Sequence, residues 1–327
     1  MAKKTKQIKL SIIIVSFNTK DTTRDCLDCV HRFSRDISNE VFVVDNASTD
    51  GSQDMVKHEF PWVRLICLDT NIGFAAGNNV GIRQASGEYI LLLNTDAFIA
   101  RGVLEKTIGF MDQYPSIGIL GCKLTNPDGT MQPSARMLPS PLNKALVMTG
   151  LSSRWPHSRF FGRVDYTWWD HSYPKGIGWV VGAYFLIRSS MIDDIGYLDE
   201  RYFLYSEEID YCKSARKARW DVVFYPHARV IHLGGQSASK TTMKMSDKGS
   251  QLVYHRLKSE FRYYRKWFGI PGVLLSSGME LSWKSLVLAK NMLSIKPSAK
   301  YKRKEALTSI LTTLKILFED NLGKGVQ

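Results

Sequence analysis

Two short segments place aspartates where a folded chain could use them for chemistry. Residues 43–52 read VVDNASTDGS and residues 91–96 read LLLNTD, so that Asp45 and Asp96 each follow an apolar run. Such runs are typical of buried strands, and open α/β sheets bind ligands at strand ends. Asp45 could accept hydrogen bonds from a base or ribose, and Asp96 could hold a divalent cation against a diphosphate. The pair indicates an enzyme that handles a nucleotide diphosphate. Ordinary turns, which also favour Asn, Asp, Ser and Gly, are the alternative.

The elements that must position these residues follow from the hydrophobic pattern. Short β-branched runs at 11–16, 41–44, 63–66 and 89–93 alternate with helical segments. Runs that are apolar on both faces and separated by helices predict a parallel sheet. Residues 122–176 lose this periodicity and collect prolines, tryptophans and histidines, which we interpret as a functional lid. A strand follows at 178–187, and its small residues would let a ligand approach the backbone.

Charge and length restrict the class of protein. The chain has 327 residues and a formal net charge of +13, so it can form a large α/β domain with an appendage and should attract an anionic partner. No nucleic-acid-binding signature is present, and we expect no nucleic-acid partner. Beyond residue 249, apolar residues recur at helical spacing while lysines and arginines lie toward another face. This pattern is typical of a helix on a membrane surface; a dimer interface and a solvated helical cap are the alternatives.

The cysteines and the apolar segments predict the compartment. Five cysteines without a repeated pairing do not form a disulfide framework, and the start of the sequence has no signal-peptide pattern. Cys26 and Cys29 lie in a predicted helix without further zinc ligands, so we assign them to packing. No stretch has the roughly 18 to 20 apolar residues that a membrane span needs. We therefore expect a cytoplasmic protein, either soluble or at the cytoplasmic face of the membrane.

Seven motifs occur in an order that resembles a known family. They are residues 15–18, 45–51, 71–79, 94–96, 179–183, 207–210 and 230–232. In this order they resemble glycosyltransferase family 2, and specifically its rhamnosyltransferase-like branch, over residues from about 10 to about 240. The resemblance implies an α/β GT-A fold, which is Rossmann-like with a mostly parallel central sheet flanked by helices. It also implies a nucleotide-sugar donor, Mg²⁺ or Mn²⁺ as the cofactor, and inversion at the anomeric carbon.

The resemblance assigns a nucleotide-sugar site residue by residue. The residues that match the surroundings of the base and ribose are Ser16, Phe17, Asn18, Asp45 and Ser48, and those that match the glycine-rich backbone are Asn71, Gly73, Phe74 and Asn78. The D-x-D position is matched by Asn94, Thr95 and Asp96. The residues that would lie beneath the donor sugar are Trp179, Gly182 and Ala183. Trp179 could stack on a sugar or fill the core, as could the neighbouring pair Trp168 and Trp169.

The resemblance also assigns the metal ligands and the catalytic base. Asp96 corresponds to the last acid of the D-x-D motif, whereas the uncharged Asn94 replaces the first. His232 matches a histidine that completes the metal site in some relatives, although a strand-end histidine bonded to the backbone is the alternative. Glu208 matches the acid that takes the proton from the acceptor hydroxyl. Because glutamate adds a methylene to the family's aspartate, Glu207 remains the alternative base.

These expectations combine into one function and one domain scheme. We expect a metal-dependent, inverting hexosyltransferase that moves a sugar from a dTDP- or UDP-sugar, with rhamnose from dTDP-rhamnose as the leading donor. The acceptor would be a glycan or polyprenyl-linked sugar in cell-surface polysaccharide synthesis. A non-catalytic nucleotide-sugar or glycan-binding module is the second interpretation. Residues 1–245 would form the GT-A domain, with a donor half at about 10–120 and an acceptor half at about 121–245. Residues 246–327 would form a basic helical region for membrane contact or for a homodimer.

Overall fold

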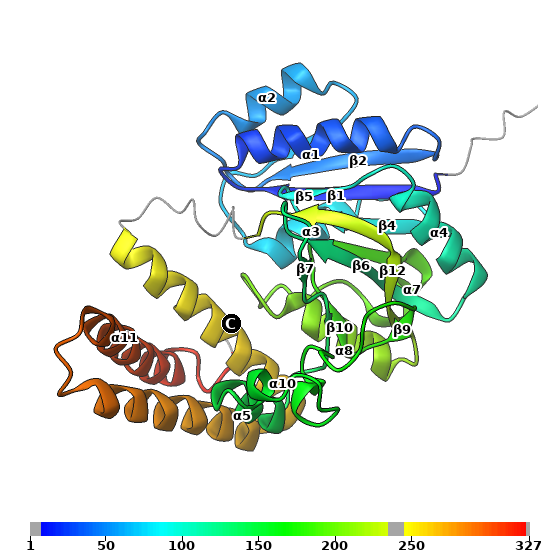
Figure 1. The fold of residues 1–327 in the computed structure, drawn as a ribbon. Helices are drawn as coiled ribbons and strands as arrows, with labels where there is room; N and C mark the ends of the chain where they lie inside the picture. The colour runs from blue at the N-terminus through cyan, green and yellow to red at the C-terminus, as the bar shows by residue number, and fades with distance from the viewer. Residues whose placement is uncertain (1–7, 235–244, 325–327) are drawn as a thin grey trace, which may run out of the picture. The chain divides into compact units, whose positions relative to one another are not determined.

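The apolar runs become strands of one ten-stranded sheet (Figure 1). The structure is a computed structural model that describes residues 8–234 and 245–324, with side chains from residue 251 in the second range. The main path of the sheet has the order β3-β2-β1-β4-β11-β6-β12-β5, while β7 pairs with β6 and β9 pairs with β12. The strands are β1 Leu10–Ser16, β2 Asn39–Asp45, β3 Arg64–Cys67, β4 Tyr89–Leu93, β5 Ala97–Phe98, β6 Ile117–Thr125, β7 Met131–Gln132, β9 Lys175–Gly176, β11 Tyr184–Arg188 and β12 Asp221–His232. A small second sheet pairs β8 Ala135–Arg136 with β10 Trp179–Val180.

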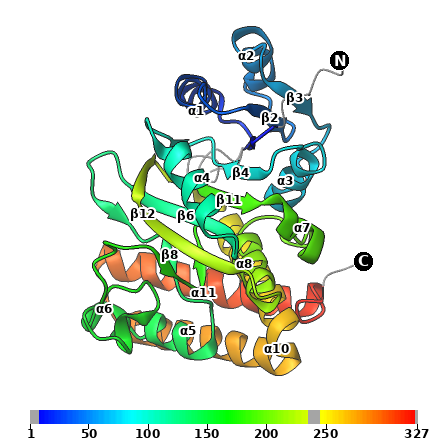
Figure 2. The ribbon, with the colours of Figure 1, turned by 90° about the vertical axis from the view of Figure 1, so that its right-hand side faces the viewer.

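Strand direction gives the sheet two chemically different edges. Strands β3, β2, β1 and β4 are parallel neighbours. Because β11 is antiparallel to both β4 and β6, the parallel pair β6 and β12 runs in the same direction as β4 (Figure 2). The ends of β1, β2, β4, β6 and β12 therefore share one edge, which we call the carboxyl edge. The starts of these strands and the end of β11 share the opposite, amino edge.

Helices cover both faces of the sheet because strand side chains alternate between them. Ile12 and Ile14 of β1 pack into a core with α1 Lys20–Phe33, α2 Ser52–Glu59 and α4 Val103–Gln113. Ile13 packs on the other face with α3 Phe74–Ile82, α7 Ser189–Ile195 and α8 Glu207–Lys217. Helix α3 approaches β1 closely, since a Cβ on Gly81 would lie 2.6 Å from Ile13 Cγ2. The predicted α/β fold with a central, mostly parallel sheet is confirmed.

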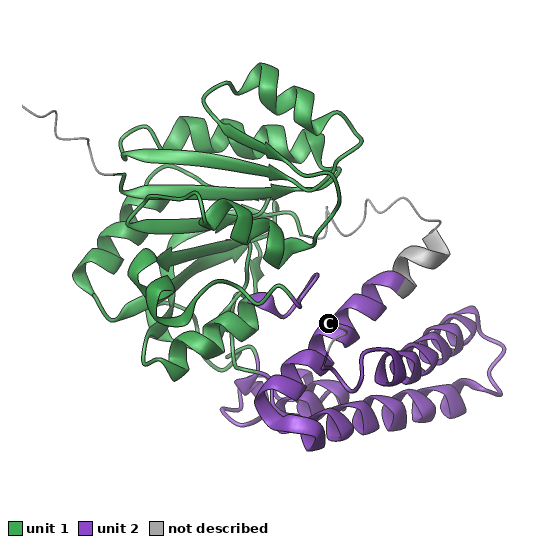
Figure 3. Cartoon of the chain, turned by 180° about the vertical axis from the view of Figure 1, so that it is seen from behind, with its two compact units in different colours: residues 1–138, 165–200, 208–241 green, residues 139–164, 201–207, 242–327 purple. Residues whose placement is uncertain are grey.

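The chain divides into two compact units (Figure 3). The sheet unit comprises residues 1–138, 165–200 and 208–241, and the helical unit comprises residues 139–164, 201–207 and 242–327. Part of the irregular segment thus groups with the carboxy-terminal helices. The predicted domain boundary at residue 245 and the predicted lid role of residues 122–176 stay predictions.

The helical unit is built from two long helices and shorter ones. Its elements are α5 Pro141–Met148, α6 Leu151–Arg154, the 3₁₀ turn η1 Phe161–Arg163, α10 Met245–Asn291 and α11 Pro297–Glu319. Helix α10 is two helices joined at a kink, where Gly269 has φ 66° and Pro271 follows. Lys144 of α5 donates to Glu260 before the kink, at 2.5 Å, and to Ser276 after it, at 2.9 Å. The predicted helical carboxy-terminal region is confirmed. Among the helices described, none is long and apolar enough to cross a membrane.

Candidate active site

Asp45 ends β2 at the carboxyl edge, and one of its oxygens is buried without a hydrogen bond from the described residues. Its Oδ1 accepts hydrogen bonds from the Ser48 backbone at 2.8 Å and from Gln53 Nε2 at 2.7 Å. The residue is 1% exposed, and within the described residues no group bonds its Oδ2. A buried acceptor left unsatisfied is costly, so this oxygen favours a ligand that donates a hydrogen bond.

The loops after β1 and β2 are tied together beside Asp45. Asn18, with φ 52°, donates its backbone N–H to Ser48 Oγ at 2.9 Å and accepts the Thr49 N–H on its Oδ1 at 2.8 Å. Ser16 is fully buried, and its hydroxyl lies 3.2 Å from the hydroxyls of two threonines on α1 or its N-cap. Ser16, Asn18 and Ser48 therefore shape this end of the site, while Phe17 beside them is half-buried.

The glycine-rich entry to α3 is held against the end of β2 by Asn46. This side chain donates to Gly73 O at 3.1 Å and accepts from the Ile72 N–H at 2.9 Å. Asn71 Oδ1 accepts a hydrogen bond from the N–H of Gly73. Gly73 has φ 91°, a backbone conformation that glycine adopts without steric cost. Asn78 is buried and donates to Phe74 O within the helix. The structure thus brings residues 71–74 next to Asp45 through Asn46, whose role the sequence interpretation missed.

Asp96 and His232 meet at the carboxyl edge because β12 pairs with β5. The register sets His232 opposite Ala97, so His232 Nε2 lies 3.4 Å from Asp96 Oδ1. Gln132 of β7 orients the imidazole: its Nε2 donates to His232 O at 2.7 Å and to Asn126 at 2.6 Å. Its Oε1 therefore accepts from His232 Nδ1, 2.8 Å away, so that Nε2 is the ring nitrogen that faces Asp96.

This pair fits a divalent cation. A carboxylate oxygen and an imidazole nitrogen that lie 3.4 Å apart are both common ligands of divalent cations, and together they can bind one. Asn94 Oδ1 and Thr95 Oγ1 are buried nearby in the sequence, and within the described residues neither has a hydrogen-bond partner. No cluster of three or more His, Cys, Asp or Glu residues that could hold a metal ion occurs in the described ranges. Two protein ligands are enough when phosphate oxygens and waters complete the shell, as is usual for Mg²⁺.

Glu208 lies close to the same turn through Gly182 and Ala183. The Asn94 N–H donates to Ala183 O at 3.2 Å. A Cβ on Gly182 would lie 3.9 Å from Cβ and Cγ of Glu208, in the first turn of α8. Glu208 is half-buried, whereas Glu207 is buried.

The backbone that leads into α8 is strained. Tyr205 and Ser206 both have φ 69°, which is costly for residues other than glycine. Strain of this kind persists where the surrounding structure imposes it, and it is concentrated at functional sites. The feature therefore adds to the case for a function at the start of α8.

Two of the three tryptophans near the predicted site, Trp169 and Trp179, are buried. Trp179 donates its Nε1–H to Met137 O at 3.0 Å, and the Arg136 guanidinium lies 5.3 Å from its ring. Trp169 is buried and stacks on His171 with ring centroids 4.4 Å apart. These contacts support the packing role for Trp169 and Trp179. Trp168 is half-buried, with Lys175 Nζ 5.3 Å from its ring.

Sequence reasoning missed several residues at the site. Asn46 lies within the motif 45–51 and Gln53 lies two residues after it, but Gln132 lies in the irregular segment, where no local pattern marks it. Thr125 ends β6 opposite Ile231, beside His232, and its Oγ1 is buried with no bond to any described residue.

The fold and this site define the class. A mannosyltransferase from Pyrobaculum calidifontis, solved with GDP-Man and Mn²⁺, matches with a TM-score of 0.54 at 14% identity, over 96% of this chain and 88% of that one. GalNAc-T7, solved with UDP, GalNAc and Mn²⁺, matches with a TM-score of 0.55 at 13% identity, over 98% of this chain and 58% of that one. The fold is therefore the GT-A fold.

The sequence comparisons then give the family. Residues 11–193 match the family model described as glycosyl transferase family 2. The N-acetylglucosaminyl-diphospho-decaprenol L-rhamnosyltransferase of Mycobacterium tuberculosis is 30% identical over 226 residues, 66% of this chain and 71% of the relative. A low-salt glycan biosynthesis hexosyltransferase of Haloferax volcanii is 26% identical over 212 residues, 64% of this chain and 62% of that protein. The chain belongs to glycosyltransferase family 2 and is a glycosyltransferase, which confirms the predicted family and disfavours a non-catalytic binding module.

Proposed function

We propose that the chain is a metal-dependent, inverting glycosyltransferase that moves rhamnose from dTDP-rhamnose to a glycan or polyprenyl-linked acceptor in cell-surface polysaccharide synthesis. The similarity to the mycobacterial rhamnosyltransferase supports this donor and acceptor. The observation that carries the proposal is the Asp96–His232 pair, because a carboxylate oxygen and an imidazole nitrogen 3.4 Å apart can bind one cation beside the turn that also contacts Ala183. We place the enzyme in the cytoplasm, with membrane contact through its carboxy-terminal helices; a homodimer stays a prediction.

Each step has a residue suited to it. Asp45 Oδ2 accepts a hydrogen bond from the donor nucleotide, and Asp96 with His232 holds Mg²⁺ or Mn²⁺. A bound divalent cation stabilises the negative charge that develops on the leaving diphosphate. The acceptor hydroxyl oxygen forms a bond to the anomeric carbon while the bond from that carbon to the diphosphate oxygen breaks. Glu208 takes the hydroxyl proton, and attack from the face opposite the diphosphate inverts the centre.

The test compares the two adjacent glutamates. Glu208→Gln should lower turnover by about 10²- to 10⁴-fold, the usual contribution of a positioned base, while donor binding persists. Glu207→Gln is the matched control and should retain most activity. Donor binding is measured by thermal shift with dTDP-, UDP- and GDP-sugars, with and without Mn²⁺, since a ligand of the folded state raises stability. Loss of turnover in Glu207→Gln alone would move the base to that residue, and unchanged turnover in both would overturn the mechanism.

A further inference from the structure

The turn between α10 and α11 exposes apolar side chains almost completely. Leu293 is 97% exposed, Ile295 is 98% exposed and Met292 is 63% exposed. We call residues 292–296 the hairpin turn; it joins the part of α10 after the kink to α11, and the two helices form a hairpin (Figure 1). Isolated exposed apolar residues are common on proteins, but several at one projecting turn indicate an interaction site.

The hairpin turn has a fixed backbone. Arg303 of α11 donates Nη1–H bonds to Met292 O at 2.7 Å and to Asn291 O at 3.3 Å. The Ser294 N–H bonds to Asn291 O at 3.3 Å. Pro297 then begins α11 at a position where its missing N–H carries no cost. The turn is thus built to present its apolar side chains rather than to fold them inward.

Basic residues flank the hairpin turn along the chain. Between Glu280 and Glu305 the chain has no acidic residue and seven basic ones: Lys284, Lys290, Lys296, Lys300, Lys302, Arg303 and Lys304. Lys284 pairs with Glu305 at 2.9 Å, and Arg303 holds the turn. The other five lysines are exposed. An apolar tip that exposed lysines flank along the chain complements a bilayer that has acyl chains beneath anionic headgroups.

We propose that the hairpin turn inserts into an anionic membrane and anchors the enzyme there. The proposal deepens the proposed function, on which it rests for the presence of a membrane-linked acceptor. Leu293 and Ile295 would enter the acyl boundary, and the flanking lysines would lie among lipid phosphates. A second copy of the chain is a poorer occupant, because a two-fold interface sets the same surface patch against itself. The lysines of two copies would then repel each other.

The test is flotation of the full chain with vesicles of phosphatidylcholine, with and without phosphatidylglycerol, in the absence of donor and acceptor. Leu293→Ser/Ile295→Ser should reduce binding to the anionic vesicles by at least about tenfold, since burying one such side chain is worth more than a factor of ten. Lys290→Gln/Lys296→Gln/Lys300→Gln should remove about fivefold for each lysine and most of the salt dependence. Leu142→Ser/Val147→Ser, two exposed apolar residues on α5, is the matched control and should bind as the wild type does.

The outcomes separate this proposal from the proposed function. Equal flotation of the wild type and the hairpin-turn variant would overturn membrane insertion, whatever the enzyme's activity. A wild-type dimer that the hairpin-turn variant converts to a monomer, with no vesicle binding by either, would assign the turn to self-association instead. Donor-induced thermal shift should be identical in the wild type and the variant. A wild type that binds vesicles but no nucleotide sugar would support insertion and contradict the proposed function.

Discussion

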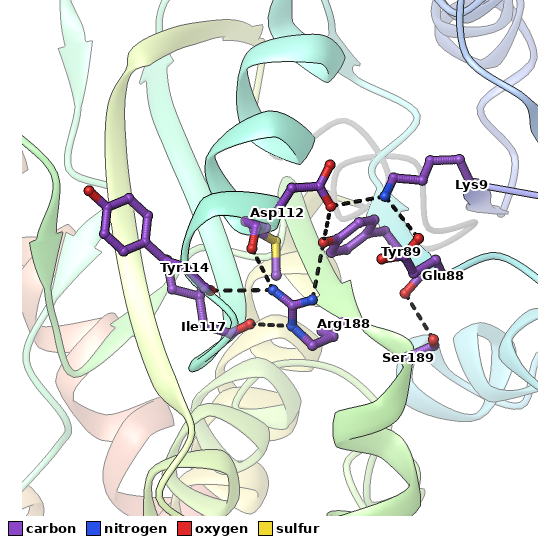
Figure 4. A network of polar contacts seen from close by, with 9 residues as sticks. Lys9, Glu88, Tyr89, Asp112, Tyr114, Ile117, Arg188 and Ser189 are labelled. Carbon is purple, nitrogen blue, oxygen red and sulfur yellow. Dashed lines mark hydrogen bonds and ion pairs between the residues drawn. The ribbon is translucent and has the colours of Figure 1, made fainter.

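The two edges of the sheet differ in whether other protein groups satisfy the hydrogen bonds of their polar groups. At the carboxyl edge, Asp45, Asn94 and Thr95 each keep a buried oxygen without a hydrogen bond from the described residues. At the amino edge, Arg188 ends β11 and donates to Met111 O at 2.6 Å, Ile117 O at 3.0 Å and Tyr89 Oη at 3.1 Å (Figure 4).

The amino-edge network continues beyond the arginine. Tyr89 donates to Asp112 at 2.7 Å, and Lys9 bridges Asp112 and Glu88 at 2.9 and 2.8 Å. Burial and the bond to Asp112 raise the pKa of Tyr89 to about 12, so its hydroxyl keeps the proton that it donates. Polar groups that satisfy one another stabilise the fold, whereas buried polar groups that lack partners are where a ligand gains most. The difference supports the carboxyl edge as the place where the proposed active site binds its ligand.

The largest expected effect on stability is at the amino edge. Arg188→Met should lower the free energy of unfolding by about 3 kcal/mol, because it leaves several carbonyl oxygens without their donor. Turnover per folded molecule should stay unchanged. Denaturant unfolding measures the first quantity and initial transfer rates the second, with exposed Arg101→Met as the control. If Arg188→Met loses activity but keeps its stability, the amino edge has a role in function and the two edges do not differ as we expect.

At the carboxyl edge we expect a substitution to weaken donor binding while stability changes little. Asp45→Asn should weaken donor binding by about 10- to 100-fold, the worth of a hydrogen bond to a charged group, and change stability by less than about 1 kcal/mol. Asp50→Asn is the matched control, because both Asp50 oxygens already accept bonds from Lys20 or Ser52. Calorimetric titration with the nucleotide sugar measures both variants. Equal weakening in the two would show that Asp45 acts through the loop rather than on the donor.

A substitution of Gln132 tests whether His232 needs the hydrogen bond with this side chain in order to bind the metal. Gln132→Leu should raise the metal concentration needed for half-maximal transfer by about tenfold, since groups that orient a ligating histidine contribute 10- to 100-fold in affinity. Saturating Mn²⁺ should restore the rate. If the rate falls while the metal requirement stays the same, His232 has a role other than metal binding.

The smallest effect involves Glu40 at the amino edge and depends on pH. Burial acts to raise the pKa of Glu40, but bonds from Ser11 and Ser86 and the charge of Arg64 outweigh it and lower that pKa. Because the folded pKa is depressed, the carboxylate stabilises the fold above its unfolded pKa of roughly 4.3, and this stabilisation is lost as pH falls through the folded value.

Glu40→Gln should therefore lower the free energy of unfolding by about 1 kcal/mol at neutral pH. The difference from the wild type should shrink as the pH falls below about 4, where the wild-type carboxylate becomes protonated. Unfolding curves across this range, with transfer rates as a control, measure it. A difference that grows toward acid would contradict the assigned sign.

The sequence by itself determined the four parallel strands β1 to β4, their order along the chain and the motifs at their ends. The single strand predicted at 178–187 is wrong, because β10 and β11 divide it between two sheets. Asp45 and Asp96 were found because turn chemistry and apolar runs are local properties, written within a few residues of each other. The carboxy-terminal helices were found for the same reason, since their apolar spacing repeats within each turn. The family followed from the order of the motifs.

The tertiary structure decided which distant residues meet. The pairing of β12 with β5 sets His232 against Asp96, and β7 brings Gln132 to the imidazole. The burial of Trp169 and Trp179 also depends on neighbours that no local pattern specifies. Contacts of this kind arise from strand register and packing between segments far apart in the chain, which hydrophobic periodicity does not encode.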